Sequence, residues 1–159
     1  MNRRALLHRR SWVVVALVAS HAAFAGDDQR TPGAAVLPKY KQECAACHVA
    51  FPPGMLPAES WRRLLGNLPH HYGTDASLDA ATVNELATWL SANAGTYRRV
   101  REAPPEDRIT RSAWFIRKHD EVPDAVWKRP AVKSAANCAA CHAQADQGDF
   151  NEHTVRIPR

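Results

Sequence analysis

The sequence predicts a mainly α-helical protein built from two small lobes, with short helices, long loops and no significant sheet. Apolar residues recur at three- and four-residue spacing in several short segments, which is typical of amphipathic helices. The chain contains 11 prolines, and these end the helical segments early because proline breaks a helix interior. One cysteine-containing pentapeptide occurs once in each half of the chain, which suggests two lobes with similar roles.

The N-terminal end has the composition of a secretory signal peptide. Four arginines precede an apolar run at residues 12–19, and Ala-Phe-Ala at 23–25 forms a small-x-small cleavage site. The apolar run is shorter than the roughly 20 residues that cross a bilayer. We therefore expect residues 1–25 to be removed on export to the periplasm, with no stable membrane insertion. Residues 26–38 are rich in Pro, Gly and polar side chains and predict a flexible N-terminal segment.

The charge balance of the mature chain argues against nucleic-acid binding. The full chain of 159 residues carries 21 Lys+Arg and 16 Asp+Glu, a net charge of +5. Removal of residues 1–25 leaves 134 residues and removes 4 basic residues and no acidic ones. The mature chain therefore has 17 basic and 16 acidic residues, a net charge of +1. The basic pI therefore describes the precursor and not a cationic binding surface. A chain of this length forms one compact domain or two very small lobes.

Three helices are predicted in the first lobe, residues 39–100. The first covers residues 40–49, carries the first cysteine motif and ends at a Pro-Pro-Gly sequence. The second lies within residues 57–68, where one tryptophan and three leucines share a face. The third is the strongest prediction, because valine and leucine recur at helical spacing behind Asp75 and Ser77, which are N-cap candidates.

The second lobe, residues 101–159, begins in a run of charges that includes a Pro-Pro pair. A helix with an aromatic face is predicted over residues 110–119, and a short helical turn over residues 123–127. Ser134 is expected to cap a last helix, which carries the second cysteine motif. The polar tail, residues 146–159, is expected to lie along the surface.

The repeated pentapeptide, C-A-A-C-H at residues 44–48 and 138–142, matches the signature of covalent haem attachment. On a helix, residues i, i+3 and i+4 share one face, so the two thiols and the imidazole point at the same object. The thiols can add to the two vinyl groups of a porphyrin while the imidazole binds its iron. The predicted cofactors are two covalent haem c groups. The motifs supply Cys44, Cys47, Cys138 and Cys141 for attachment, and His48 and His142 as proximal iron ligands.

A redox dithiol and a zinc site are the other interpretations of these cysteines. A thioredoxin-like site needs a βαβ context, which the sequence does not predict. A four-cysteine zinc site spaces its pairs by roughly 12 to 20 residues, whereas Cys47 and Cys138 are 91 apart. A zinc site would also leave both motif histidines unexplained. Because the two motifs use every cysteine of an exported chain, the two-haem interpretation is favoured.

The ligand on the far side of each iron decides the function. Methionine or histidine closes the sixth position for electron transfer, whereas an open position allows gas binding or catalysis. Met55 is the one methionine of the mature chain, so at most one haem can have a histidine and a methionine ligand. Met55 also lies too near His48 in the sequence to reach the opposite face of the porphyrin. The remaining candidates are histidines: His70, His71, His119 and His153.

The residues alone do not decide among these histidines. His70 and His71 are adjacent, so only one of them can face a given haem. His119 ends the predicted aromatic helix, where a neighbouring carboxylate could orient it as a ligand, and the alternative is a C-cap histidine that the helix dipole stabilises. His153 lies in the polar tail and is the weaker candidate.

The sequence resembles the small bacterial dihaem cytochrome c family over essentially the whole mature chain. Besides both haem motifs, the resemblance rests on F-P-P-G at 51–54, H-Y-G at 71–73, A-S-L at 76–78, R-K-H-D-E-V-P at 117–123, W-K-R-P-A-V at 127–132, G-D-F at 148–150 and V-R-I-P-R at 155–159. Carried over position by position, it implies that His71 and His119 are the distal ligands. Because each of them lies in the same predicted lobe as one motif, we expect His71 to serve the first haem and His119 the second; the alternative is the crossed arrangement.

The resemblance implies a periplasmic electron carrier with two low-potential bis-histidine haems, and not an enzyme. Its expected partners are a small monohaem c-type cytochrome that receives electrons and, in some cases, a membrane b-type cytochrome. The alternative is a haem enzyme, such as a peroxidase or reductase, or a gas-binding cytochrome. Either alternative requires one open or displaceable axial position.

Overall fold

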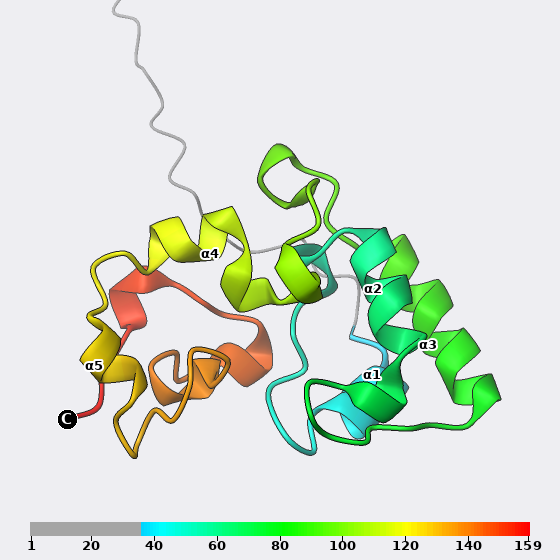
Figure 1. Cartoon of the computed structure of the whole chain (residues 1–159), viewed down its shortest axis with the longest axis horizontal. Coiled ribbons are helices and arrows are strands. Elements are labelled where there is room, and N and C mark those ends of the chain that lie inside the picture. Colours follow the sequence, from blue (N-terminus) through cyan, green and yellow to red (C-terminus); the bar gives the residue numbers. More distant parts are fainter. Residues whose placement is uncertain (1–35) are drawn as a thin grey trace, which may run out of the picture.

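A computed structural model describes residues 36–159, which form short helices joined by long loops (Figure 1). The α-helices of this range are α1 (Pro38–Cys44), α2 (Ala58–Leu65), α3 (Ala80–Ala92), α4 (Ala113–Lys118) and α5 (Asp124–Trp127). Its 3-10 segments are η1 (Pro53–Met55), η2 (Leu68–His70), η3 (Arg98–Val100), η4 (Pro105–Asp107), η5 (Ile109–Arg111), η6 (Cys138–Ala140), η7 (Ala145–Gln147) and η8 (Glu152–Thr154).

The mainly helical, sheet-poor prediction is confirmed. Between residues 36 and 159 no strand forms, and His71 and Thr74 make an isolated β-bridge. The predicted signal peptide, residues 1–25, and most of the predicted flexible segment, residues 26–38, lie outside the described residues.

The longest helix of the described part, α3, is capped by Asp79, four residues after Asp75 and two after Ser77, the predicted caps. The Asp79 carboxylate accepts hydrogen bonds from the N–H groups of Ala81 and Thr82, both at 3.0 Å, and so satisfies two of the free donors at the helix start. Asp75, a predicted cap, instead accepts from the N–H of Ser77 at 2.9 Å in the turn before the helix.

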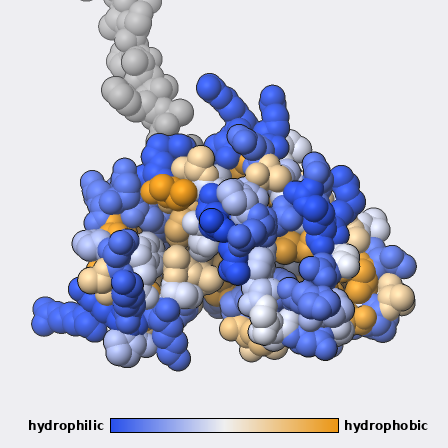
Figure 2. Space-filling model, viewed as in Figure 1, coloured by the Kyte–Doolittle hydropathy of each residue, from blue (hydrophilic) through white to orange (hydrophobic). Residues whose placement is uncertain are grey.

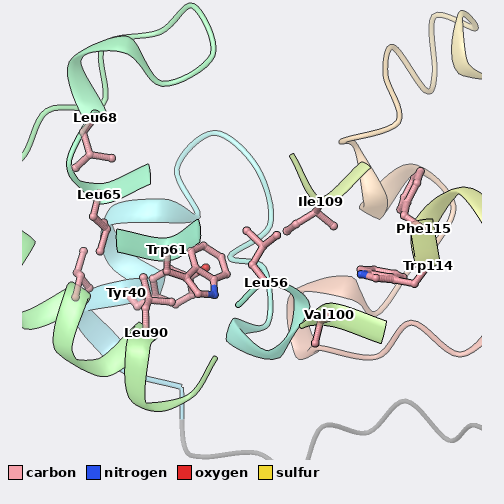
Figure 3. Close-up of a cluster of buried hydrophobic side chains, with 11 residues drawn as sticks. Tyr40, Leu56, Trp61, Leu65, Leu68, Leu90, Val100, Ile109, Trp114 and Phe115 are labelled. Carbon is pink, nitrogen blue, oxygen red and sulfur yellow. The ribbon is translucent and has the colours of Figure 1, made fainter. Parts of the chain in front are cut away.

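The helices α1, α2 and α3 pack around one aromatic core, which holds the chain that follows the first cysteine motif. The ring of Tyr40 lies edge-on to Trp61, 6.4 Å between centres, and its hydroxyl donates to the Phe51 carbonyl at 2.8 Å. The Trp61 indole N–H donates to the Pro53 carbonyl at 2.7 Å. Figure 3 shows Tyr40 and Trp61 close to Leu90 of α3. This core therefore fixes the loop beyond His48.

The helix α4 is shorter than predicted because Ser112 starts it. The Ser112 hydroxyl accepts from the Phe115 N–H at 3.2 Å and donates to the Ile109 carbonyl at 2.7 Å. Ser112 has extended backbone angles, so residues 109–111 form the separate segment η5 and not a first helical turn. His119 is the C-cap residue, and its N–H donates to the Ile116 carbonyl at 3.2 Å.

The predicted helix at the second cysteine motif is wrong. Ser134 caps no helix, and the segment forms only η6. The segment is alanine-rich and presents no apolar stripe that could stabilise a helix by packing. At the first motif, α1 ends at Cys44, so the predicted helix over residues 40–49 stops halfway.

The buried apolar residues are unevenly distributed along the chain. One buried cluster runs from Tyr40 through Leu86 to Phe115, and Figure 3 shows how it continues from Trp61 past Leu56 towards Trp114. Beyond Phe115, the buried apolar residues of the described chain are only Val126, Val132 and Ala145. Figure 1 shows α1–α3 on one side and α4, α5 and the C-terminal segment on the other. The division into lobes at residues 39–100 and 101–159 stays a prediction.

The surface is mainly hydrophilic on the face that Figure 2 shows, with scattered apolar residues. No helix between residues 36 and 159 has the length and apolar character needed to span a bilayer.

Candidate functional site

Each cysteine motif of this chain forms a tight turn, and only the first adjoins an α-helix. Cys44 is the last residue of α1 and Cys47 lies exposed in the turn that follows. In the second motif the His142 N–H donates to the Cys138 carbonyl at 2.8 Å, so the five residues form a single helical turn although no helix extends from them. The two cysteines of each motif are not joined by a disulfide.

The C-terminal tail is fastened to the second motif. The Arg156 N–H donates to the Cys141 carbonyl at 2.9 Å, and the Arg129 guanidinium donates to the Pro158 carbonyl at 2.6 Å. The tail is therefore part of the wall around this site.

The structure places each motif histidine opposite the histidine that was predicted as its distal partner. The ring centres of His48 and His71 are 6.2 Å apart, and those of His119 and His142 are also 6.2 Å apart. An imidazole nitrogen binds a transition metal at about 2.0 Å, and the ring centre lies about 1.15 Å further, so two imidazoles on one iron have centres about 6.3 Å apart. The spacing of both pairs fits a haem iron held between two imidazoles.

Two of the four imidazoles are fixed by a hydrogen bond to a backbone carbonyl. His48 Nδ1 lies 2.7 Å from the Val49 carbonyl oxygen, and His119 Nδ1 lies 2.9 Å from the Phe115 carbonyl oxygen. A carbonyl only accepts, so Nδ1 carries the proton in both rings and Nε2 keeps its lone pair for a metal.

The other two imidazoles are buried at Nδ1 without a hydrogen-bond partner. This applies to His71 and His142, which both have partly buried rings. Burial lowers the pKa of both rings, and the facing histidine, His48 or His119, lowers it further. Both effects favour the neutral imidazole, which is the form that binds a metal.

Phenylalanine rings pack against three of these histidines. Phe51 stacks on His48 with centres 4.8 Å apart, Phe115 stacks on His119 at 4.0 Å, and Phe150 lies 5.5 Å from His142. These contacts were not predicted from the sequence. Phe115 precedes His119 by four residues on a helix, and this spacing could have indicated the contact. Phe51 and Phe150 approach across loops, for which the sequence offers no comparable signal.

The thiols are arranged for thioethers and not for a zinc site. Burial raises the pKa of Cys44 and of Cys138 to about 11, and it also raises the pKa of Cys141. Disulfide exchange requires the thiolate, which these pKa values disfavour. In residues 36–159 no group of three or more His, Cys, Asp or Glu side chains gathers as a metal site. Paired histidines suffice when a porphyrin supplies the four other nitrogens.

The remaining candidate ligands have other surroundings. His70 is exposed, and its Nδ1 lies 3.2 Å from the side-chain oxygen of Asn67. His153 is exposed in η8. Met55 packs against the apolar cluster.

A mainly helical chain in which two C-x-x-C-H turns each face a further histidine defines a c-type cytochrome. The family model described as "Dihaem cytochrome c" matches residues 40–150. The chain belongs to the dihaem cytochrome c family, and its cofactors are two covalently bound haem c groups.

Solved structures of this family resemble the chain along most of its length. A dihaem cytochrome c from Shewanella baltica OS155 is 38% identical, with a TM-score of 0.67, and the match covers 76% of this chain and 92% of that one. A dihaem cytochrome c from Rhodobacter sphaeroides is 41% identical, with a TM-score of 0.65, and the match covers 73% of this chain and 98% of that one. No curated protein sequence matches the chain.

Proposed function

We propose that this protein is an electron carrier in which each haem iron is held by two histidines. Cys44 and Cys47 would attach the first haem, between His48 and His71. For the second haem the attaching residues are Cys138 and Cys141, and the ligands are His119 and His142. The observation that carries this proposal is the spacing of the facing imidazoles, 6.2 Å between ring centres in both pairs.

Two imidazole ligands suit a group that only exchanges electrons. Haem supplies a one-electron couple, and imidazoles on both faces keep the iron six-coordinate, so little rearrangement accompanies reduction. Replacing a methionine ligand by histidine lowers the reduction potential. Where His48 and His119 donate from Nδ1 to a carbonyl, the basicity of the ligand rises. Both effects favour a low-potential donor.

The distribution of apolar side chains suggests that the second haem completes a core. Residues 101–159 contribute few buried apolar side chains of their own beyond α4, and small domains with little core depend on cofactors or crosslinks. Phe115, Trp127 and Phe150 lie near His119 or His142, where they can pack against a haem. We infer one haem in each of the lobes 39–100 and 101–159.

The location and the partners belong to the same proposal. The predicted signal peptide points to the periplasm, where covalent haem attachment to an exported chain is expected. A low-potential donor suits a small monohaem c-type cytochrome as acceptor, and a membrane b-type cytochrome is the proposed electron source. Because Cys47 is exposed, the edge of the first haem that it would attach lies close to the surface. This position favours electron exchange there.

The test separates a carrier from a haem enzyme or a gas-binding cytochrome that has an open axial position. We expect optical spectra of the holoprotein without added ligand to show both haems low-spin in the oxidised and in the reduced state. A potentiometric titration should give two one-electron waves, both below the range of His/Met cytochromes. The reduced protein should pass electrons to a small monohaem cytochrome c. A high-spin haem in the isolated protein would overturn the carrier function and favour an enzyme or gas-binding cytochrome.

A further inference from the structure

The four proposed iron ligands are not equally restrained. His48 and His142 follow their cysteines directly, so two thioethers hold each of them beside its haem. His119 has no such tether, but its Nδ1 donates to the Phe115 carbonyl at 2.9 Å and its ring stacks on Phe115 at 4.0 Å. Trp127 lies 5.8 Å from the same ring. The contacts of its own imidazole ring thus hold His119 in place.

His71 has neither kind of restraint. Its Nδ1 is buried with no hydrogen-bond partner. The ring of Tyr72 lies 4.9 Å away at 57°, which is no parallel stack. His71 belongs to a four-residue turn outside any α-helix, closed by the Thr74 N–H donating to the His71 carbonyl at 3.0 Å. Tyr72 and Gly73 in this turn have positive φ angles of 50° and 96°.

The turn of His71 is fastened to the rest of the chain through Tyr72. The Tyr72 hydroxyl donates to the Glu106 carbonyl at 2.8 Å, and the Arg108 guanidinium lies over the Tyr72 ring at 4.0 Å. The position of this ligand therefore depends on the contacts of Tyr72 and on backbone hydrogen bonds, such as that from the His71 N–H to the Leu68 carbonyl at 3.2 Å, and not on a hydrogen bond of its imidazole.

We propose that His71 is the exchangeable axial ligand, and that the first haem is where a small neutral ligand such as carbon monoxide binds. The proposal rests on the bis-histidine ligation of the proposed function. With haem bound, His71 Nε2 would give up its bond to the iron as the incoming ligand formed one, with no change in protons or electrons. His71 then turns away with its loop, while His119 keeps the second haem closed.

The first experiment counts the carbon monoxide bound by dithionite-reduced holoprotein, in the native chain and in two variants. We expect one carbon monoxide per chain in the native protein and one in His71→Ala, because the first haem binds it in both: by exchange of His71 in the native protein, and at the open position in the variant. We expect two in His119→Ala, because its second haem is now open and its first still exchanges. The native protein should bind more slowly than His71→Ala, since His71 must leave first.

Other counts overturn the proposal. If the second haem exchanged instead, His71→Ala would bind two and His119→Ala one. If neither haem exchanged, the native protein would bind none and each variant one. These results leave the proposed carrier function intact, because that function fails only if a haem is high-spin without added ligand or lacks a low-potential wave. If His119→Ala does not fold, the native protein and His71→Ala still decide the matter.

The second experiment tests the restraint by Tyr72 without removing a ligand. Tyr72→Phe should raise the affinity of the first haem for carbon monoxide by about two- to tenfold, the range expected for loss of one hydrogen bond. Tyr97→Phe is the matched control. Tyr97 is 40% exposed against 39% for Tyr72, and its hydroxyl donates to the Gly54 carbonyl at 2.9 Å. Equal effects of both variants, or none for Tyr72→Phe, would overturn the role of Tyr72.

Discussion

The imidazole planes of His119 and His142 cross at 72°, whereas those of His48 and His71 are within 24° of parallel. The two pairs have the same spacing and differ in this angle. The plane of His119 is set by Phe115, which lies within 20° of it and accepts its Nδ1 hydrogen bond. The two pairs of facing histidines are therefore oriented by different local packing.

This difference predicts that the two haems are distinguishable by electron paramagnetic resonance. Parallel imidazole planes split the iron d orbitals that they overlap, whereas crossed planes leave these orbitals nearly equal in energy. The oxidised protein should show one rhombic low-spin signal and one strongly anisotropic signal with a larger maximum g value, in equal amounts. Phe115→Leu should change only the second signal. A single signal that accounts for both haems would contradict this reading of the geometry.

The variant His119→Ala should leave the second haem five-coordinate. About half of the haem should become high-spin in the optical spectrum, because His119 is the proposed distal ligand opposite His142 and no thioether tethers it. His70→Ala and His153→Ala are the controls, since both side chains are exposed, and both variants should keep the native spectrum. An unchanged spectrum for His119→Ala would remove it from the ligand set.

The sequence predicted those features that depend on neighbours along the chain. Leu86 and Leu90, predicted to share the apolar face of one helix, are 0% and 1% exposed. The choice of His71 over His70 came from the family resemblance, and the structure brings His71 opposite His48. Its assignment as a ligand remains a prediction.

Features that depend on distant contacts could not be predicted. The Tyr72 hydroxyl meets a carbonyl 34 residues away, and Arg63 pairs with Asp107 over 44 residues. Nothing in the local pattern around either residue indicates such a partner. The second cysteine motif was predicted as a helix because its spacing suits one, but a single turn gives the same alignment of Cys138 and His142.

The pairing of Arg63 with Asp107 predicts a stability that depends on pH. Arg63 donates to both carboxylate oxygens, at 2.9 and 2.6 Å, and these hydrogen bonds lower the pKa of Asp107 below its ordinary value. A carboxyl with a lowered folded-state pKa contributes stability above its unfolded pKa and loses it as the pH falls through the folded value. Asp107→Asn should therefore lower the unfolding midpoint at neutral pH and leave it unchanged in strong acid.

Urea unfolding of the holoprotein at several pH values measures this effect. Asp146→Asn is the control, because it removes one exposed carboxylate of η7. A destabilisation by Asp107→Asn that stayed constant down to strong acid would mean that the ion pair is not its cause.

Buried apolar side chains predict unequal effects of losing either haem. The first part of the chain retains buried side chains of its own, including Tyr40, Trp61, Leu86 and Leu90, whereas beyond α4 the described chain buries only Val126, Val132 and Ala145 among its apolar residues.

Replacing Cys138 and Cys141 by alanine should therefore leave one haem and a second part that does not hold its structure. Hydrogen exchange measures this effect amide by amide. The amide of Val132, which donates to the Arg129 carbonyl at 2.9 Å, should lose its protection from exchange, while the amide of Leu90 in α3 keeps its protection.

The matched control replaces Cys44 and Cys47 by alanine. This change should lower the protection of the Leu90 amide less than the first variant lowers that of Val132, because α2 and α3 still pack on each other. Equal losses in the two variants would mean that the second haem contributes no more to its surroundings than the first. The expected asymmetry follows from area: burying apolar surface contributes about 25 cal/mol per Å², and the second part has little of its own to bury until its haem is attached.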